Sequence, residues 1–77
     1  MVRAFIMVET GAGESRSVLD PVRGLGGVDE AHIVAGAWDL IVEVSADEVY
    51  QVLEAVSGDI ASVDGVADTK TYVSLDG

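Results

Sequence analysis

The chain has 77 residues, 49% of them hydrophobic, and a formal net charge of −10 from 14 acidic and four basic side chains. Such an acidic surface repels nucleic-acid phosphates and anionic lipids, which disfavours direct binding to either. Cysteine is absent and there is one histidine, so disulfides and Cys-rich or His-rich metal centres are excluded, and we expect no metal and no cofactor. Because a domain this small is marginally stable alone, oligomerisation is the remaining way to stabilise it.

The sequence also bears on location and domain number. No apolar stretch approaches the ~18 residues of a membrane span, and no signal-peptide pattern precedes the first strand. We therefore expect a cytoplasmic protein with a single domain, residues 1–77. The acidic excess with only one lysine, Lys70, is typical either of a charge that keeps a protein soluble or of a salt-loving (halophile) source, and both interpretations stay open.

The first element is predicted to be a strand, since residues 2–9 alternate with a period of two. Residues 10–13, Thr-Gly-Ala-Gly, break the alternation. A helix is predicted from Glu14 to about Gly24, because apolar residues recur there at helical spacing: Val18, Leu19, Val22 and Leu25.

Two features interrupt this first helix. Pro21 removes one backbone donor and predicts either a kink near Ser17 or a second short helix that starts at Asp20. The glycine-rich run 24–27 then stops the helix. A dinucleotide-binding loop follows a strand and opens a helix, and this run does the reverse, so it does not predict such a loop.

The second half repeats the same pattern. Strands are predicted at 28–35 and 39–44, joined by the turn 36–38. Residues 45–48, Ser-Ala-Asp-Glu, have the spacing of a capping box. They predict the start of a second helix, whose apolar residues follow at helical offsets: Val49, Val52, Leu53, Val56 and Ile60. A turn at Gly65 precedes the last strand, residues 66–75.

The order βαββαβ, made of two similar halves, predicts an α+β, ferredoxin-like fold. Right-handed crossovers place the first and third strands in the centre of a four-stranded antiparallel sheet, with two helices on one face. The helix-facing side is predicted to carry Ala4, Ile6, Val8, Leu40, Val42 and Val44.

The other side of the sheet is predicted to be apolar as well. Phe5, Met7 and Ile41 point there by alternation, together with Tyr72. A sheet that faces water carries polar residues on that side, and a contiguous apolar patch indicates an interaction surface. We therefore predict a sheet-to-sheet dimer, a dimeric α+β barrel. The alternative is a monomer with scattered exposed apolar residues.

Few residues indicate chemistry. Asp39 follows a turn of small residues and Trp38, and its carboxylate fits two interpretations equally on spacing alone: binding of a ligand's ammonium group, or local hydrogen bonds of the turn. His32 has no nucleophile near it in sequence, which favours a histidine on the sheet surface over a catalytic base. The acidic residues are spread over helix faces and loop edges, so no converging carboxylate pair is expected.

Several short motifs, by their order and spacing, resemble the Lrp/AsnC ligand-binding domain, also called the RAM domain. The resemblance covers essentially the whole chain. Full-length members of that family carry an N-terminal helix-turn-helix that binds DNA, and this chain resembles the stand-alone form without it. The motifs are Gly27-Val28, Val34-Ala35-Gly36-Ala37-Trp38-Asp39-Leu40, Gly65-Val66, Thr69-x-Thr71 and Val73-x-Leu75.

The resemblance implies dimers that join through their sheets, often rings of four dimers, and amino-acid effectors bound between dimers. It implies that Asp39 pairs with the effector's amino group, that backbone amides of the Gly36 turn or the hydroxyls of Thr69 and Thr71 take its carboxylate, and that Trp38 flanks its side chain. Ala35 stands where family members usually have threonine, so one hydroxyl is missing. The implied effector site is Gly36, Ala37, Trp38, Asp39, Thr69 and Thr71.

Residues and resemblance together predict a small-molecule sensing and oligomerisation module of the Lrp/AsnC transcription-regulator type, which acts without a DNA-binding domain of its own and is not an enzyme. The predicted partners are further copies of the chain, an amino-acid effector and full-length Lrp/AsnC regulators. Two alternatives stay open: a small monooxygenase-like α+β-barrel enzyme that uses His32, Trp38 or Tyr72, and an assembly module without a ligand.

Overall fold

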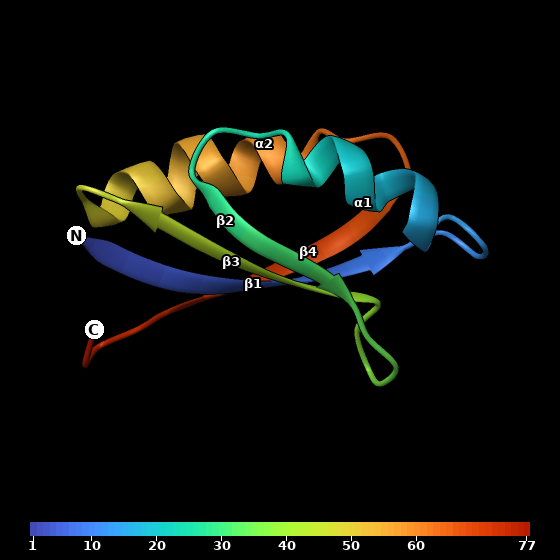
Figure 1. Cartoon of the computed structure of the whole chain (residues 1–77), viewed down its shortest axis with the longest axis horizontal. Helices are drawn as coiled ribbons and strands as arrows, with labels where there is room; N and C mark the ends of the chain where they lie inside the picture. Colours follow the sequence, from blue (N-terminus) through green and yellow to red (C-terminus); the bar gives the residue numbers. More distant parts are fainter.

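The polypeptide forms two layers, a four-stranded antiparallel sheet and a layer of helices on one of its faces (Figure 1). The computed structural model describes residues 1–77. The strand order is β2-β3-β1-β4, with β1 and β3 in the centre, so the predicted ferredoxin-like fold is confirmed. The elements are β1 (Val2–Thr10), α1 (Ser15–Arg23), β2 (Val28–Ile33), β3 (Leu40–Ala46), a π-helical segment η1 (Gln51–Val56) that runs on into α2 (Ser57–Ala61), and β4 (Val66–Val73).

The core lies between the sheet and the helices, because strand alternation directs every second side chain to that side. At its centre, Ile6 pairs with Val42 on β3 and with Thr71 on β4. All six residues predicted for the helix-facing side are buried, so that prediction is confirmed. The helices complete the core with Val18, Leu19, Val22, Val52, Val56 and Ile60.

Helix α1 is continuous through Pro21. The predicted alternative of a second short helix starting at Asp20 is therefore wrong. Val18 and Val22 are fully buried against the sheet on either side of Pro21, and this packing keeps the chain helical despite the missing backbone donor.

No helix in the structure has the length and apolarity that crossing a membrane requires.

The predicted capping box at residues 45–48 is wrong. Ser45 and Ala46 are still part of β3, where they pair with Arg3 and Val2 of β1, so strand pairing takes the residue that was expected to cap the helix. The helix instead begins after Glu48, whose backbone N–H donates to Oε1 of Gln51 at 2.9 Å. A capping box has two reciprocal hydrogen bonds, and one of them is present here, between Glu48 and Gln51. It lies three residues later than predicted.

The second helix differs from a regular α-helix over Gln51–Val56, where the chain forms a π-helix. Its i→i+5 hydrogen bonds widen the turn. Val52, Val56 and Ile60 are buried as predicted. Val49 and Leu53, also predicted to face the core, are 45% and 52% exposed. The wider turn keeps Val52, Val56 and Ile60 on the side that faces the sheet. It directs Val49 and Leu53 to solvent.

Strand β2 contains a shift of register that decides which side chains face which way. Val28 pairs with Val44, whereas Glu30 pairs with Glu43, so the chain has one extra residue between the two pairs. Such a bulge re-aims the side chains that follow it. Ala31 is buried beneath the helices as a result, while Glu30 and His32 point to the opposite side of the sheet.

Gly58 in α2 offers a simple test of the helix. A Cβ atom added there would meet no atom within 4 Å, and the backbone is helical. We expect Gly58→Ala to raise the free energy of unfolding by about 0.5–1 kcal/mol, because alanine loses less backbone entropy in a helix. Urea denaturation at one protein concentration measures the change, and a destabilised variant would contradict the helical assignment at this position.

Candidate functional site

The connection between β2 and β3 is folded against the end of the sheet. The backbone N–H of Val34 donates to the carbonyl of Asp39 at 2.9 Å, and the N–H of Asp39 donates to the carbonyl of Val8 at 2.9 Å. Figure 1 shows the loop projecting beyond the strands, on the side away from the helices. The turn is therefore anchored at Asp39 and free at its tip.

The half-buried Asp39 is held in place by hydrogen bonds to another part of the chain. Its Oδ2 accepts hydrogen bonds from the backbone N–H of Thr10 at 2.8 Å and from the hydroxyl of Thr10 at 3.3 Å. The Thr10 hydroxyl in turn lies 2.9 Å from Oγ of Ser15 in the first turn of α1. The bonds from Thr10 join the carboxylate to β1, 29 positions away in the sequence, and not to the turn itself, so the side chain of Asp39 does not make the local turn hydrogen bonds that the sequence suggested. The second oxygen, Oδ1, accepts no hydrogen bond from the chain.

The other residues of the turn are open to solvent. Gly36 and Ala37 are exposed, and Trp38 is half-buried. A Cβ atom at Gly36 would meet no atom within 4 Å, and Gly36 does not have a positive φ. Nothing in the chain's own packing therefore requires glycine at this position.

Thr69 and Thr71 lie on the helix-facing side of β4, which answers a point that the sequence left open. Thr69 pairs with Val8 and Thr71 with Ile6, both core residues of β1. The Thr71 hydroxyl lies 3.2 Å from Oγ of Ser57 in α2, so it already has a partner within the fold. Thr69 lies closer to the end of the sheet, where Val8 also pairs with Leu40, the residue after Asp39.

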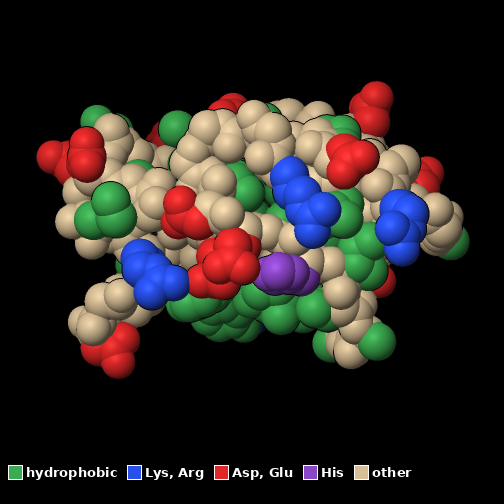
Figure 2. Space-filling model, viewed as in Figure 1, with side chains coloured by type: hydrophobic (Ala, Val, Ile, Leu, Met, Phe, Trp, Pro, Cys, Tyr) green, Lys and Arg blue, Asp and Glu red, His purple; other side chains and the backbone are tan.

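The side of the sheet that the helices leave uncovered, here called the open face, carries the predicted apolar patch. Phe5, Met7 and Ile41 are half-buried and Tyr72 is 50% exposed. The register places Phe5 beside Tyr72 and Met7 beside Ile41, which makes the patch continuous. Figure 2 shows apolar side chains gathered along this lower side of the molecule.

Basic side chains border the patch. The guanidinium carbon of Arg3 lies 5.9 Å from the ring centre of Phe5, and Nζ of Lys70 lies 5.7 Å from that of Tyr72. Both distances are within the range of cation–π attraction. The patch thus has an apolar centre and a charged rim.

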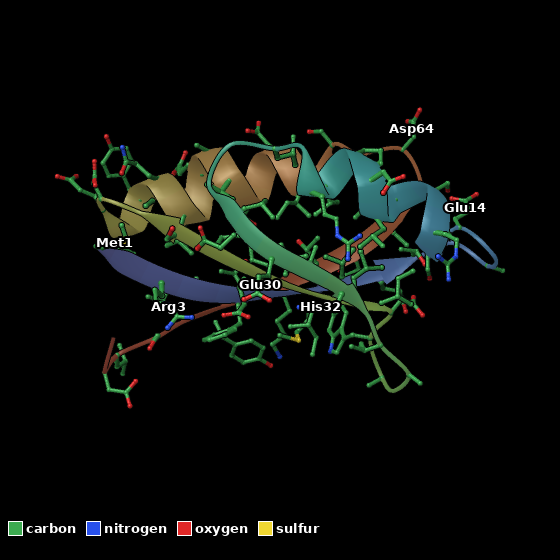
Figure 3. All side chains as sticks on the ribbon, viewed as in Figure 1. Met1, Arg3, Glu14, Glu30, His32 and Asp64 are labelled. Atoms are coloured by element: carbon green, nitrogen blue, oxygen red, sulfur yellow. The ribbon has the colours of Figure 1, made fainter.

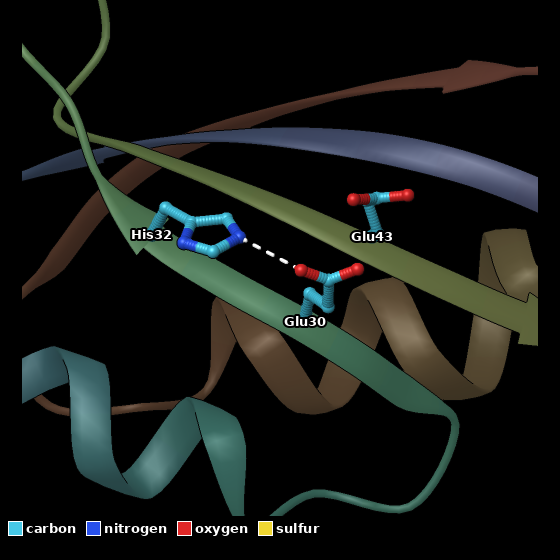
Figure 4. Close-up of side chains that lie close together, drawn as sticks. All are labelled: Glu30, His32 and Glu43. Atoms are coloured by element: carbon cyan, nitrogen blue, oxygen red, sulfur yellow. Dashed lines mark hydrogen bonds and ion pairs between the residues drawn. The ribbon is translucent and has the colours of Figure 1, made fainter.

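A cluster of polar side chains lies beside this patch. His32 is exposed on the sheet surface, as predicted, and its Nε2 lies 3.1 Å from Oε1 of Glu30. Glu43 of β3 is directly across from Glu30, and the ligand atoms of these three residues all lie within 4.8 Å of one another (Figure 4). The expectation that no carboxylates converge is therefore wrong. The spacing Glu-x-His within a strand was the available signal, but Glu43 joins only through the bulged register.

A shallow hollow of about 400 Å³ lies at the opposite end of β3 from the turn. It is bounded by the glycines that precede β2, by the last residues of β3 and by η1. It contains none of the residues that the sequence singled out as candidate site residues. Its lining includes Met1, Gly27, Asp47, Gln51 and Ala55.

The fold and the motifs at the turn agree with a family match over nearly the whole chain. The model of the Lrp/AsnC ligand binding domain matches residues 3–77. The chain belongs to this family. The predicted resemblance to the Lrp/AsnC ligand-binding domain is thereby confirmed.

The proteins similar to this chain include named transcriptional regulators and proteins of known structure. An uncharacterized HTH-type transcriptional regulator of Pyrococcus abyssi is 38% identical over 61 residues, which are 79% of this chain and 41% of that protein. The chain thus spans less than half the length of that curated relative. The protein TTHA0845 from Thermus thermophilus is 25% identical with a TM-score of 0.90, over 100% of this chain and 96% of that one.

A further structure is that of the transcriptional regulator NMB0573 from Neisseria meningitidis in complex with L-Met. It is 22% identical with a TM-score of 0.73, over 97% of this chain and 50% of that one. At 22% identity, this similarity shows only that the two proteins share a fold.

Proposed function

We propose that this Lrp/AsnC domain senses a small molecule, an amino acid, and transmits the signal through contacts between its subunits. The family match over residues 3–77 carries the proposal, because it assigns the whole chain to a ligand-binding domain. The NMB0573 structure, a complex with L-Met, supports an amino acid as the class of effector. The named relatives are transcriptional regulators, which supports a regulatory and non-enzymatic role.

The turn at residues 36–39 is the proposed effector site. An ammonium group approaches the free Oδ1 of Asp39, while Oδ2 stays bound to Thr10 and holds the carboxylate in place. The exposed tip at Gly36 lets the backbone approach the ligand, and Trp38 offers an apolar surface for its side chain. The roles of Thr69 and Thr71 remain predictions, and the engaged hydroxyl of Thr71 makes Thr69 the more available of the two.

Oligomerisation through the open face is the second part of the proposal. A two-fold dimer would cover the patch of Phe5, Met7, Ile41 and Tyr72 with the same patch of a partner. Effector binding at a seam between subunits would then favour one assembly over another, because a ligand shifts an equilibrium only through unequal affinity for its states.

The proposed partners are further copies of this domain and full-length Lrp/AsnC regulators. The match to the TTHA0845 structure covers 96% of that solved chain, which supports a domain of this size acting as a separate unit. A chain of this kind would regulate by joining oligomers of full-length Lrp/AsnC regulators. Its own acidic surface disfavours DNA, with a net charge of −10.

A thermal-shift screen against the twenty amino acids tests the effector site. We expect at least one amino acid to raise the melting temperature, since a ligand that binds only the folded state stabilises it. Gly36→Val should abolish the shift and leave the melting temperature of the free protein unchanged, because a Cβ atom added there meets no atom within 4 Å while the larger side chain occupies the surface of the turn.

In the same screen, Asp39→Asn distinguishes the negative charge of Asp39 from its hydrogen bond to Thr10. Asparagine keeps an oxygen that can accept from Thr10, whereas alanine would release the end of β1 and confuse loss of binding with loss of folding. The Asn variant should fold normally and lose the amino-acid response. A full response in both the Gly36 and the Asp39 variants would place the effector elsewhere, and no response in the wild type would favour an assembly module without a ligand.

A further inference from the structure

The cluster of Glu30, His32 and Glu43 on the open face has the composition and arrangement of a metal site. We propose that these three side chains bind one divalent transition-metal ion, of the Zn²⁺ class, at the β2–β3 edge of the sheet. The donors are one imidazole nitrogen of His32 and one carboxylate oxygen from each glutamate, and they all lie within 4.8 Å of one another. Figure 4 shows the three side chains projecting from the same side of the two strands.

The backbone places these donors without help from flexible loops. Residues two apart in a strand share a face, which aligns Glu30 with His32, and Glu43 is the direct cross-strand neighbour of Glu30. The bulge after Val28 is essential, because without it Glu30 would face the helices. Bulges are enriched beside functional sites, where they redirect a side chain.

The donor atoms would have to rearrange to bind one ion, since they lie within 4.8 Å of one another. Bonds of about 2.0–2.2 Å from His nitrogen and carboxylate oxygen to Zn²⁺ place neighbouring ligand atoms roughly 3.4 Å apart in a tetrahedron. Nε2 of His32 and Oε1 of Glu30 are already 3.1 Å apart. Since the side chains of Glu30 and His32 are 59% and 56% exposed, they can rotate toward an ion without disturbing the core.

The electrostatics of the cluster favour a cation. Two glutamates directly opposite each other on one face repel, which destabilises the sheet unless a positive charge lies between them. Arg3 supplies part of this charge through its Nη2, which is 2.8 Å from Oε1 of Glu43. Figure 3 shows Arg3, Glu30 and His32 along the same side of the sheet. The cluster still carries a net charge of −1 with neutral histidine, because one arginine offsets only one of the two carboxylates.

The donor set indicates which ion binds. An imidazole with two carboxylates suits borderline metals such as Zn²⁺ or Co²⁺, whereas Mg²⁺ and Ca²⁺ prefer oxygen donors alone. Three protein ligands leave a position for water, as in zinc sites that are open to solvent. The bond from Arg3 orients the Glu43 carboxylate and leaves Oε2 available to the ion.

Isothermal titration calorimetry of the full chain with ZnCl₂, after treatment with a chelator, tests the proposal. We expect one ion to bind per chain. Bound Co²⁺ should give a visible absorption spectrum, and this spectrum should persist in excess Mg²⁺, because Mg²⁺ does not displace the Co²⁺ ion. His32→Ala, Glu30→Gln and Glu43→Gln should each weaken Zn²⁺ binding at least about tenfold, since even residues that only support ligands contribute 10–100-fold. His32 is the only histidine, so no other imidazole can replace it.

Glu9→Gln is the matched control, because Glu9 is exposed on β1 and pairs with Asp68, outside the cluster. It should bind Zn²⁺ as the wild type does. Unchanged melting temperatures of the metal-free variants would exclude misfolding as the cause of lost binding. Equal Zn²⁺ affinity in wild type and His32→Ala, or equal losses in the Glu9 variant and the cluster variants, would overturn the proposal. The test is independent of the amino-acid response.

Discussion

Replacing Phe5 with aspartate is expected to convert the proposed dimer into a folded monomer. Phe5 lies within the apolar patch on the open face, and its cross-strand neighbours are Tyr72 and Glu43, neither of which can pair with a new carboxylate. In a monomer the aspartate stays in water, whereas in a sheet-to-sheet dimer both copies would be buried at a cost of several kcal/mol each. The dissociation constant should therefore rise at least about 1,000-fold.

Sedimentation or light scattering over a range of concentrations measures this effect. Leu53→Asp is the matched control, since Leu53 is also an apolar side chain, 52% exposed, but lies on the helix layer. It should leave the dimer intact. A wild-type protein that stays monomeric at high concentration, or a Phe5 variant that still dimerises, would contradict the proposed interface.

Gly65→Ala is expected to give the largest loss of stability among single small substitutions. Gly65 has a φ of +98°, where an L side chain is strained, and its added Cβ would lie 2.8 Å from Cγ2 of Val18. Val18 is fully buried and cannot move away freely. Backbone strain and overpacking together cost about 2–5 kcal/mol. A domain of 77 residues has a total stability of only about 4–12 kcal/mol.

Chemical denaturation at equal protein concentrations measures the change, because subunit association would make stability depend on concentration. Gly36→Ala is the control, with no positive φ and no atom within 4 Å of the added Cβ. It should unfold like the wild type in the absence of effector. A Gly65 variant as stable as the Gly36 variant would show that the turn before β4 relaxes easily.

The sheet was predictable because its pattern is local. Alternation in residues 2–9 and again in the third strand identified both sides of the central pair, and burial of Ile6 and Val42 against the helices confirmed the assignment. The strand order follows from the handedness of two crossovers, which needs no knowledge of side-chain contacts.

Predictions failed where tertiary contacts override local patterns. Ser45 looked like a helix cap, but pairing with Arg3 extends β3 through it. Leu53 has ideal helical spacing, yet the π turn directs it outward. The bulge after Val28 has no clear signature in the sequence, so the meeting of Glu30 with Glu43 could be found only from the register.

The candidate effector site was predictable in position but not in detail. Spacing identified Asp39, yet could not say whether its carboxylate served the fold or a ligand. Its partner, Thr10, lies 29 positions away in the sequence, so only the folded chain reveals the bond. The side occupied by Thr69 and Thr71 likewise depended on the pairing of β4 with β1.

The π-helical segment also affects how the chain tolerates changes in length. A π turn contains one residue more than the α-helix from which it derives. Loss of an outward residue such as Leu53 would leave Val52 and Val56 three positions apart, still on the same side of an ordinary α-helix. The connection from β3 to β4 can thus shorten by a single residue while both strands keep their places, which makes η1 the natural point for a deletion in the course of evolution.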